Sequence, residues 1–365
     1  MMDADRPAGP LRKGWTTGAC ATAAAAAAYR ALLTGTFPDP VTVALPRGGR
    51  LTLPLARGVL GDGRASAGVI KDAGDDPDVT HGSEVVVTVH AGPRGSGVTF
   101  HAGEGVGIVT LPGLPLPVGE PAINPAPRQM IADAIRTVAE ELDAAGDVAV
   151  TIAIPGGEVL AAKTLNGRLG IVGGLSVLGT TGVVVPFSCA AWIHSIHRGV
   201  DVARALGLAH VAAATGKTSE AAVKAHYRLP DAALLDMGDF VGGTLKYLRT
   251  HPLPLLTIAG GFAKMVKLAQ GHLFLHSSKS QVDMDRLASL LASIGAPAET
   301  VAEARDANTA AQVLVLAETR SLPLADAVAA DARKVALAAV SEATRIEVTV
   351  FDRQGRLVGR AGPDG

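Results

Sequence analysis

The polar residues of one irregular loop, "KDAGDDPDVTHGSE" at positions 71–84, form the densest group in the N-terminal half that could do chemistry. Asp72, Asp76 and His81 from this loop are candidates for proton transfer, because carboxylates and imidazoles are common general acids and bases. The same aspartates could instead cap turns. They could also hold a hard cation through oxygen ligands, although the spacing lacks the final Glu of an EF-hand loop.

Three glycine-containing turns in the second half follow predicted strands, at "TGKTSE" (215–220), "MGDFVGG" (237–243) and "AGGFAKMVKLA" (259–269). Because ligands of parallel sheets bind at the carboxyl ends of the strands, these turns predict one crevice for a small molecule. The candidate ligand-binding residues are Thr215, Gly216, Lys217, Met237, Gly238, Asp239, Gly260 and Gly261. The alternative is that the glycines only allow tight connections between strand and helix.

The standard nucleotide fingerprints are absent from these turns. "TGKTSE" ends like a phosphate-binding P-loop, but the first glycine of that motif would fall at Val211. "GEGVG" at 103–107 has two glycines of a dinucleotide-binding loop, with Ile108 where the third belongs. His194 and His197 are three residues apart without a nearby third ligand, so the sequence predicts no metal bound by the protein itself.

The elements that position these residues change character along the chain. The first half contains short valine-rich strands at 41–46, 51–56, 66–71, 84–90 and 97–101. The segment 118–130 then opens a helix that runs to about Ala145, with Pro127 in its first turn, and a strand follows over 147–154. From about Gly179, strand and helix alternate, with strands expected at 182–188, 209–215, 232–238 and 254–260. Such alternation favours βαβ units and a parallel sheet.

The expected fold is therefore two-domain α/β. Residues 1–178 form an N-terminal α+β domain with a mixed sheet and the substrate cleft. Residues 179–330 form a C-terminal domain with alternating strands and helices and a mainly parallel sheet, Rossmann-like but without the usual glycine fingerprint. Residues 331–365 form a helix and a β-hairpin that could attach to either sheet.

Composition narrows the class of protein. The chain has 365 residues, a formal net charge of −1 and 3% aromatic residues, which argues against binding to nucleic acid. No apolar stretch reaches the roughly 20 residues of a membrane span, and the N-terminus lacks a signal-peptide pattern. The two cysteines, Cys20 and Cys189, do not suggest a disulfide framework, so we expect a cytoplasmic protein.

An alanine-rich helix is predicted after "LRKGWTTG", from about residue 17. Thr16 or Thr17 can cap it, and the positive end of the helix dipole suits a carboxylate of a substrate. The alanines could equally serve close packing of the helix against a sheet. Cys20 lies near the helix N-terminus, where a thiol pKa can be lowered, although a buried and inert thiol is the alternative.

Long and unusual strings in this sequence resemble those of the CbiD family, the cobalt-precorrin-5B C1-methyltransferases of anaerobic cobalamin biosynthesis. The resemblance covers about residues 11 to 280 and rests on strings that occur in the family's order: "RKGWTTGACATAAAAA", "KDAGDDPDVTHG", "GEGVGIVT", "GEPAINPAPR", "NGRLGIVGGLSVLGTTGVV", "TGKTSE", "MGDFVG" and "KLAQG". The sequence departs from the family pattern at Trp15, where tyrosine is usual, and at Leu111, where lysine often stands.

The resemblance implies transfer of a methyl group from S-adenosyl-L-methionine to C1 of a cobalt-precorrin ring, whose cobalt comes with the substrate. It implies cations facing the carboxylate arms of the ring. It also implies a carboxylate or histidine that helps to move a proton, for which Asp72, Asp76, His81 and Glu104 are the candidates. The candidate substrate-binding residues are Thr16, Thr17, Lys71, Arg128, Arg168 and Lys264. Neighbouring enzymes of the pathway and a second copy of the chain are compatible partners. The rival functions are a corrinoid-binding carrier without catalysis and a small-molecule kinase.

Overall fold

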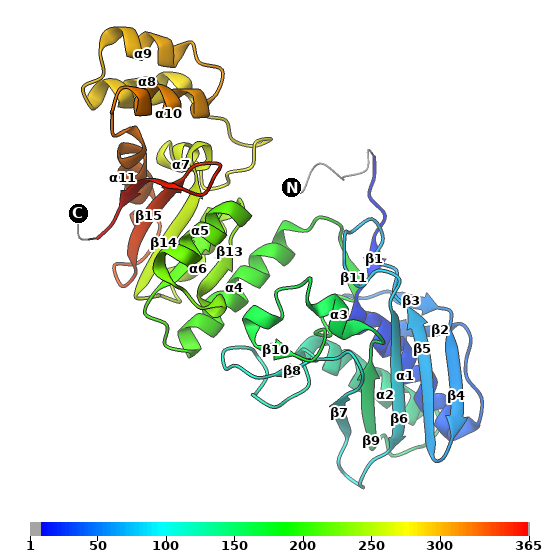
Figure 1. The fold of residues 1–365 in the computed structure, drawn as a ribbon. Coiled ribbons are helices and arrows are strands. Elements are labelled where there is room, and N and C mark those ends of the chain that lie inside the picture. The colour runs from blue at the N-terminus through cyan, green and yellow to red at the C-terminus, as the bar shows by residue number, and fades with distance from the viewer. Residues whose placement is uncertain (1–8, 364–365) are drawn as a thin grey trace. The chain divides into compact units, whose positions relative to one another are not determined.

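The structure is a computed structural model that describes residues 9–363. The chain divides into two compact units, Met1–Cys189 (unit 1) and Ala190–Gly365 (unit 2), and each combines helices with strands (Figure 1). The prediction of a mixed α/β protein is confirmed. Over the described residues, no helix combines the length and the apolar character needed to cross a membrane.

Unit 1 is built mainly from strands and two long helices. Its strands are β1 (Gly14–Trp15), β2 (Val41–Ala44), β3 (Arg50–Leu53), β4 (Arg57–Gly61), β5 (Arg64–Ile70), β6 (Glu84–Ala91), β7 (Val98–Ala102), β8 (Ile108–Val109), β9 (Val148–Ala153), β10 (Ile171–Val172) and β11 (Val183–Val184). Its helices are α1 (Thr17–Thr34), α2 (Pro125–Glu141), the short α3 (Gly157–Ala161) and the 3₁₀ turn η1 (Gly167–Leu169).

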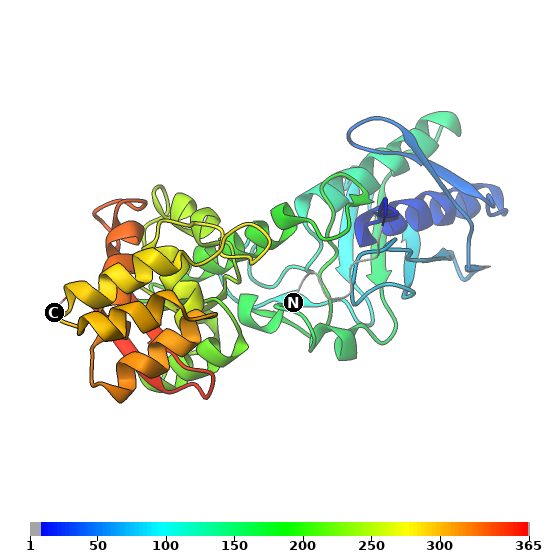
Figure 2. The same ribbon diagram turned by 90° about the horizontal axis from the view of Figure 1, so that it is seen from above.

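The main sheet of unit 1 has the order β4-β5-β6-β9-β7, in which only β7 and β9 run parallel. Alternate residues of β5, β6 and β9 point into a core shared with α1 and α2. The two helices lie side by side, as Figure 2 shows in dark blue and green. Polar residues such as Ser66, Thr88 and Thr151 lie between the core residues, which is the pattern of a sheet with one face on the core.

Helix α1 forms where the alanine-rich stretch predicts it and is capped at both ends. The hydroxyl of Thr16 accepts a hydrogen bond from the Ala19 N–H at 3.1 Å, and Gly35, at φ 80°, closes the helix by donating to Ala31. Every residue from Thr17 to Tyr29 is buried, against α2 on one side and β5 and β6 on another. Methyl side chains therefore allow close packing of this helix against both neighbours.

Unit 2 contains more helix than unit 1. Its strands are β12 (Val211–Ala214), β13 (Leu234–Asp236), β14 (Leu255–Gly261), β15 (Arg345–Phe351) and β16 (Leu357–Ala361). Its helices are α4 (Cys189–Ala205), α5 (Lys217–Tyr227), the 3₁₀ turn η2 (Asp231–Ala233), α6 (Val241–Leu248), α7 (Phe262–Ala269), α8 (Met284–Ser293), α9 (Ala298–Arg305), α10 (Ala310–Thr319) and α11 (Leu324–Leu337).

The sheet of unit 2 has the order β13-β12-β14-β15-β16, parallel except for the terminal strand β16. Alternate residues such as Val211 and Ile258 face a core formed with α4, α6, α7, α8, α9, α10 and α11, while Ala212 and Ala259 face α5. In chain order the parallel strands are arranged 2-1-3-4, so the strand order reverses between β12 and β14. The carboxyl ends of those two strands form a topological switch point, where ligands of such sheets bind.

The structure differs from the sequence-based expectations at one predicted strand and at both predicted domain boundaries, and it decides between the two sheets for the C-terminal hairpin. The strand predicted at 182–188 does not begin the parallel sheet, because only Val183–Val184 are extended and they pair with β1 in unit 1. The two compact units divide after Cys189, whereas the sequence predicts a boundary after residue 178. The second predicted boundary, after residue 330, falls inside α11. The C-terminal hairpin joins the sheet of unit 2, where β15 pairs with β14.

Candidate functional site

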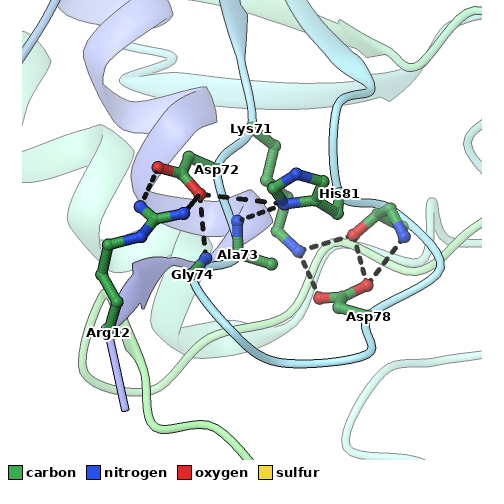
Figure 3. Close-up of polar contacts among 8 residues, drawn as sticks. Arg12, Lys71, Asp72, Ala73, Gly74, Asp78 and His81 are labelled. Atoms are coloured by element: carbon green, nitrogen blue, oxygen red, sulfur yellow. Dashed lines mark hydrogen bonds and ion pairs between the residues drawn. The ribbon is translucent and has the colours of Figure 1, made fainter. Parts of the chain in front are cut away.

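The loop 71–84 is held against the N-terminal segment by an ion pair between Arg12 and Asp72 (Figure 3). Two guanidinium nitrogens of Arg12 donate to the two carboxylate oxygens of Asp72, one of them at 2.9 Å. The Gly74 N–H donates to the same carboxylate at 2.9 Å. The hydrogen bond from Arg12 is the largest cause that lowers the pKa of Asp72 to about 2. Asp72 is therefore ionised at neutral pH, and a role in proton transfer there is not supported.

Two glycines allow this contact. A side chain at Gly14 would place its Cβ 2.0 Å from the Ala73 carbonyl carbon, and one at Gly74 would lie 2.2 Å from the Arg12 carbonyl oxygen. The backbones also exchange hydrogen bonds, from Trp15 to Asp72 at 2.7 Å and from Asp75 to Arg12 at 3.0 Å. Gly14 and Gly74 are thus required for backbone contact between two segments far apart in the sequence.

Lys71 is buried beneath this loop, with 1% of its surface exposed. Its ammonium pairs with Asp78 and donates to the Thr80 hydroxyl at 2.6 Å. Burial opposes ionisation of Asp78, but the Lys71 charge holds the pKa of that carboxyl below its usual value. The prediction that Lys71 binds a substrate carboxylate is not supported by this geometry, since the charge is already neutralised inside the protein.

His81 lies at the exposed side of the same loop. Its Nδ1 accepts a hydrogen bond from the Ala73 N–H at 3.1 Å and lies 3.8 Å from an Asp72 oxygen (Figure 3). A neutral imidazole that accepts at Nδ1 carries its proton on Nε2. His81 can therefore donate a hydrogen bond from Nε2, while its Nδ1 is occupied by the Ala73 N–H.

Burial raises the pKa of the Asp76 carboxyl above its ordinary value, in contrast to Asp72. The hydrogen bond that Asp76 accepts from the Phe187 N–H at 2.8 Å lowers this pKa, but by less than burial raises it. Of the four predicted acid–base residues, it has the environment that best suits a general base. Glu104 is exposed, and its Oε1 accepts a hydrogen bond at 3.4 Å from the N–H of Gly156, just before α3.

The N-terminus of α1 is occupied by the protein itself. Besides the Thr16 cap, the Gly18 N–H donates to the Leu178 carbonyl at 2.9 Å, and Thr17 is buried. The prediction that Thr16 and Thr17 present free amides to a substrate carboxylate is thus not supported. Burial raises the pKa of Cys20 to about 12, so the alternative of an inert thiol applies.

Arg128 also acts within unit 1. Its guanidinium donates to Glu120 at 2.9 Å and to the carbonyls of Ile123 at 2.8 Å and Pro121 at 3.1 Å. These hydrogen bonds connect residues 120–123 to the first turn of α2. The main contacts of Arg128 are therefore structural. Arg168 lies in η1.

Unit 2 contains a cavity of about 870 Å³ at the carboxyl ends of its parallel strands. Four segments line it: Thr215–Ser219 after β12, Gly261–Lys264 at the end of β14, one face of α10, and residues 351–354 with Arg356 at the end of β15. The volume is in the range of about 300–1,000 Å³ that small-molecule sites occupy. The cavity lies at the switch point between β12 and β14.

The structure brings part of the predicted crevice to this cavity. Thr215, Gly216, Lys217 and Gly261 line it, and so does Lys264, which the sequence analysis assigns to substrate binding. Lys264 donates to the Thr215 carbonyl at 2.6 Å and forms an ion pair with Asp239 at 2.9 Å, so Asp239 positions a lining residue.

Four of the predicted glycine-turn residues, Met237, Gly238, Asp239 and Gly260, do not line the cavity. Met237 is fully buried in the core of unit 2, and the N–H groups of Met237 and Gly238 both donate to the Ala214 carbonyl at 3.1 Å. Gly260 packs close to Met265 and Thr215, because a Cβ there would lie 2.5 Å and 2.8 Å from their side chains. These residues shape the strand ends.

The predicted histidine pair makes aromatic contacts. His197 stacks on Tyr247 with ring centroids 3.8 Å apart, and burial lowers its pKa. Among residues 9–363, the structure contains no group of three or more His, Cys, Asp or Glu side chains that could hold a metal ion.

Sequence reasoning missed Arg12 as the partner of Asp72 and missed the residues that α10 and the 352–356 turn contribute to the cavity. The turn carries a local signal, since "DRQG" between two valine-rich segments is typical of a hairpin. Its place beside Thr215–Ser219 depends on the pairing of β15 with β14, which no local pattern specifies.

Comparison with known proteins covers almost the whole chain. The family model CbiD matches residues 4–186, and the model of the CbiD C-terminal domain matches residues 274–362. A protein of Bradyrhizobium sp. named cobalt-precorrin-5B C(1)-methyltransferase is 61% identical over 96% of this chain and 94% of its own length. A protein of the same name from Rhodospirillum rubrum is 59% identical over 96% of this chain and 98% of its own.

The crystal structure of a cobalamin biosynthesis protein (cbiD) from Archaeoglobus fulgidus matches 69% of this chain and 77% of that chain, at 28% identity and a TM-score of 0.40. From the two family models and the near-full-length relatives, the chain belongs to the CbiD family.

Proposed function

We propose that this chain is a cobalt-precorrin-5B C(1)-methyltransferase, which transfers a methyl group from S-adenosylmethionine to C1 of the ring and yields cobalt-precorrin-6A in cobalamin biosynthesis. One observation carries the proposal: proteins with this name are 56–61% identical to the chain over 96% of its length. Neither rival, the carrier nor the kinase, has an observation of this weight in its favour.

We place the methyl donor in the cavity of unit 2, which we regard as a Rossmann-like domain lacking the glycine fingerprint. The residues present fit such a ligand. Gly216 and Gly261 have no atom within 4 Å of the position a Cβ would take, so a ligand can approach their backbones. Thr215 is 4% exposed and lines the cavity, and its hydroxyl has no hydrogen-bond partner within the described part of the chain.

We place the ring substrate at unit 1, where the loop 71–84 presents His81 and Asp76. The Nε2–H of His81 is suited to donate to a carboxylate arm of the ring. The donor supplies the methyl group already activated, so the protein needs no nucleophile of its own. Most of its contribution is to hold the reacting carbons at attack distance, which intramolecular models show to be worth several orders of magnitude in rate.

Asp76 is the residue we propose for removal of a proton during methylation. Burial raises the pKa of its carboxyl toward the operating pH, which makes the carboxylate a better base than Asp72. Asp72 and Arg12 hold the loop in place. Lys71, which is buried beneath the loop, is left out of the proposed substrate contacts.

The test is incubation of the purified chain with isotope-labelled S-adenosylmethionine and cobalt-precorrin-5B. We expect a labelled product one methyl group heavier, detected by mass spectrometry. Turnover of ATP, or retention of the unmethylated ring without transfer, would instead favour the kinase or the carrier. Asp239→Asn removes the charge that pairs with Lys264 and should weaken donor binding in calorimetry, with Asp133→Asn on α2 as the matched control.

A further inference from the structure

The cavity of unit 2 has a second wall that the strand-end glycines do not supply. It is formed by α10 and by the turn 352–356 between β15 and β16. The carboxylate of Asp352 accepts hydrogen bonds from the N–H groups of Gln354 at 2.9 Å and Arg356 at 2.8 Å, and pairs with the Arg356 guanidinium at 2.6 Å. The turn is therefore a fixed feature of the cavity wall.

The same turn packs against the start of α5. At Gly355, where φ is 79°, an added Cβ would lie 3.7 Å from the Thr218 methyl and 3.6 Å from Ala222. This contact places the turn, with the exposed Arg353, next to the first turn of α5, which carries Lys217. Two cations from segments far apart in the sequence thus line one cavity.

The charges that line the cavity are of two kinds. Arg356 is neutralised by Asp352, and Lys264 by Asp239. The side chains of Lys217, Arg353 and Glu318 line the same cavity and make no hydrogen bond or ion pair with any residue from 9 to 363. The cavity therefore offers two unpaired positive groups and one unpaired negative group to a ligand.

This pattern selects a class of ligand. A group that carries only carboxylates would satisfy the cations but would be repelled by Glu318. A group with a carboxylate and an ammonium, as in a free amino acid, has a partner for each side chain. A guanidinium binds a carboxylate with two parallel hydrogen bonds, which favours Arg353 as the main contact.

We propose that this cavity binds the amino-acid end of the methyl donor, with Arg353 and Lys217 contacting the carboxylate and Glu318 contacting the ammonium. This rests on the proposed function, because it takes S-adenosylmethionine as the donor. It adds α10 and the 352–356 turn to the donor site and makes Arg353, Lys217 and Glu318 determinants of donor specificity.

The test is isothermal titration calorimetry of the full chain with two ligands. S-adenosylhomocysteine has the carboxylate and ammonium, whereas 5′-methylthioadenosine lacks both. We expect the wild type to bind the first more tightly. Arg353→Gln and Lys217→Met should each weaken binding of S-adenosylhomocysteine by about 10- to 100-fold, the range for a lost charged hydrogen bond, and leave 5′-methylthioadenosine unchanged. Glu318→Gln should act in the same direction.

Arg249→Gln, at the exposed end of α6, is the matched control and should change neither affinity. If the variants bind S-adenosylhomocysteine as the wild type does, or lose affinity for both ligands equally, the amino-acid assignment is wrong while methyl transfer by the wild type still supports the proposed function. If the wild type neither binds S-adenosylhomocysteine nor transfers a methyl group, the proposed function fails, and this assignment with it.

Discussion

The buried pair of Lys71 and Asp78 allows a quantitative test of whether Lys71 stabilises the fold or binds substrate. Lys71 is 1% exposed, while the Asp78 side chain is 25% exposed and also accepts hydrogen bonds from the Thr80 N–H at 2.8 Å and hydroxyl at 2.6 Å. The two partners are thus buried unequally. Removing one or the other should therefore have unequal costs.

Asp78→Asn leaves the Lys71 ammonium without its counter-charge in a buried position. Loss of one partner of a buried pair costs about 3–5 kcal/mol, because the remaining charge is uncompensated. Lys71→Met fills the same space with an apolar chain and leaves Asp78 partly hydrated and bonded to Thr80. Its cost should be at most about 1.5–3 kcal/mol, the value of a hydrogen bond between charged groups.

The double variant Lys71→Met with Asp78→Asn should be close to Lys71→Met alone, since no ammonium remains to be paired. The two changes are therefore strongly non-additive, as expected for residues in contact. Asp133→Asn on α2 is the matched control. It removes the same charge from the pair of Asp133 with Arg136, whose side chains are 45% and 62% exposed, and should cost about 0–1 kcal/mol.

The assay is urea unfolding followed by tryptophan fluorescence. The chain has two tryptophans, one in each unit, so the Trp192→Phe background leaves Trp15 as the reporter of unit 1. Trp15 lies next to the loop 71–84, because its backbone N–H donates a hydrogen bond to the Asp72 carbonyl at 2.7 Å. Equal costs for Asp78→Asn and the control would refute the reasoning. So would a Lys71→Met variant of unchanged stability that binds the ring substrate weakly.

Three further predictions follow from the geometry. The Asp72 carboxyl has a pKa of about 2, so the stability that it contributes above its unfolded pKa is lost as the pH falls from about 4 toward 2. Arg12→Gln should raise this pKa in an NMR titration. An unchanged pKa would contradict the ion pair. If Asp76 is the base, the rate of methyl transfer should fall as the pH drops through the raised pKa of its carboxyl. Asp76→Asn should lower kcat and remove the acidic limb of the pH–rate profile. An intact acidic limb would exclude Asp76 as the base. Iodoacetamide should label only the exposed Cys189 in the native chain and both cysteines after denaturation, because Cys20 is buried and its pKa is about 12. Labelling of a native Cys189→Ser variant would contradict this, since it would show that Cys20 is accessible.

Local features of the fold could be predicted from the sequence because they depend on neighbouring residues. The Thr16 cap and the alanine run specify α1, and strict alternation of exposed and buried residues specifies strands such as β3. The strand at 182–188 was mispredicted for the same reason. Its apolar run satisfied a local pattern, but its actual partner is the distant strand β1.

The sequence by itself determined the family, through long unusual strings, and identified the loop 71–84 and the turn at 215–220 as places for chemistry. Only the tertiary structure decided what each charged residue does there. Lys71 is buried against Asp78, Arg12 reaches Asp72 across 60 positions, and the pairing of β15 with β14 brings Arg353 to the cavity of Lys217. The reason is physical: the effect of a charge depends on its burial and on its partner, and both are set by contacts between segments far apart in the chain.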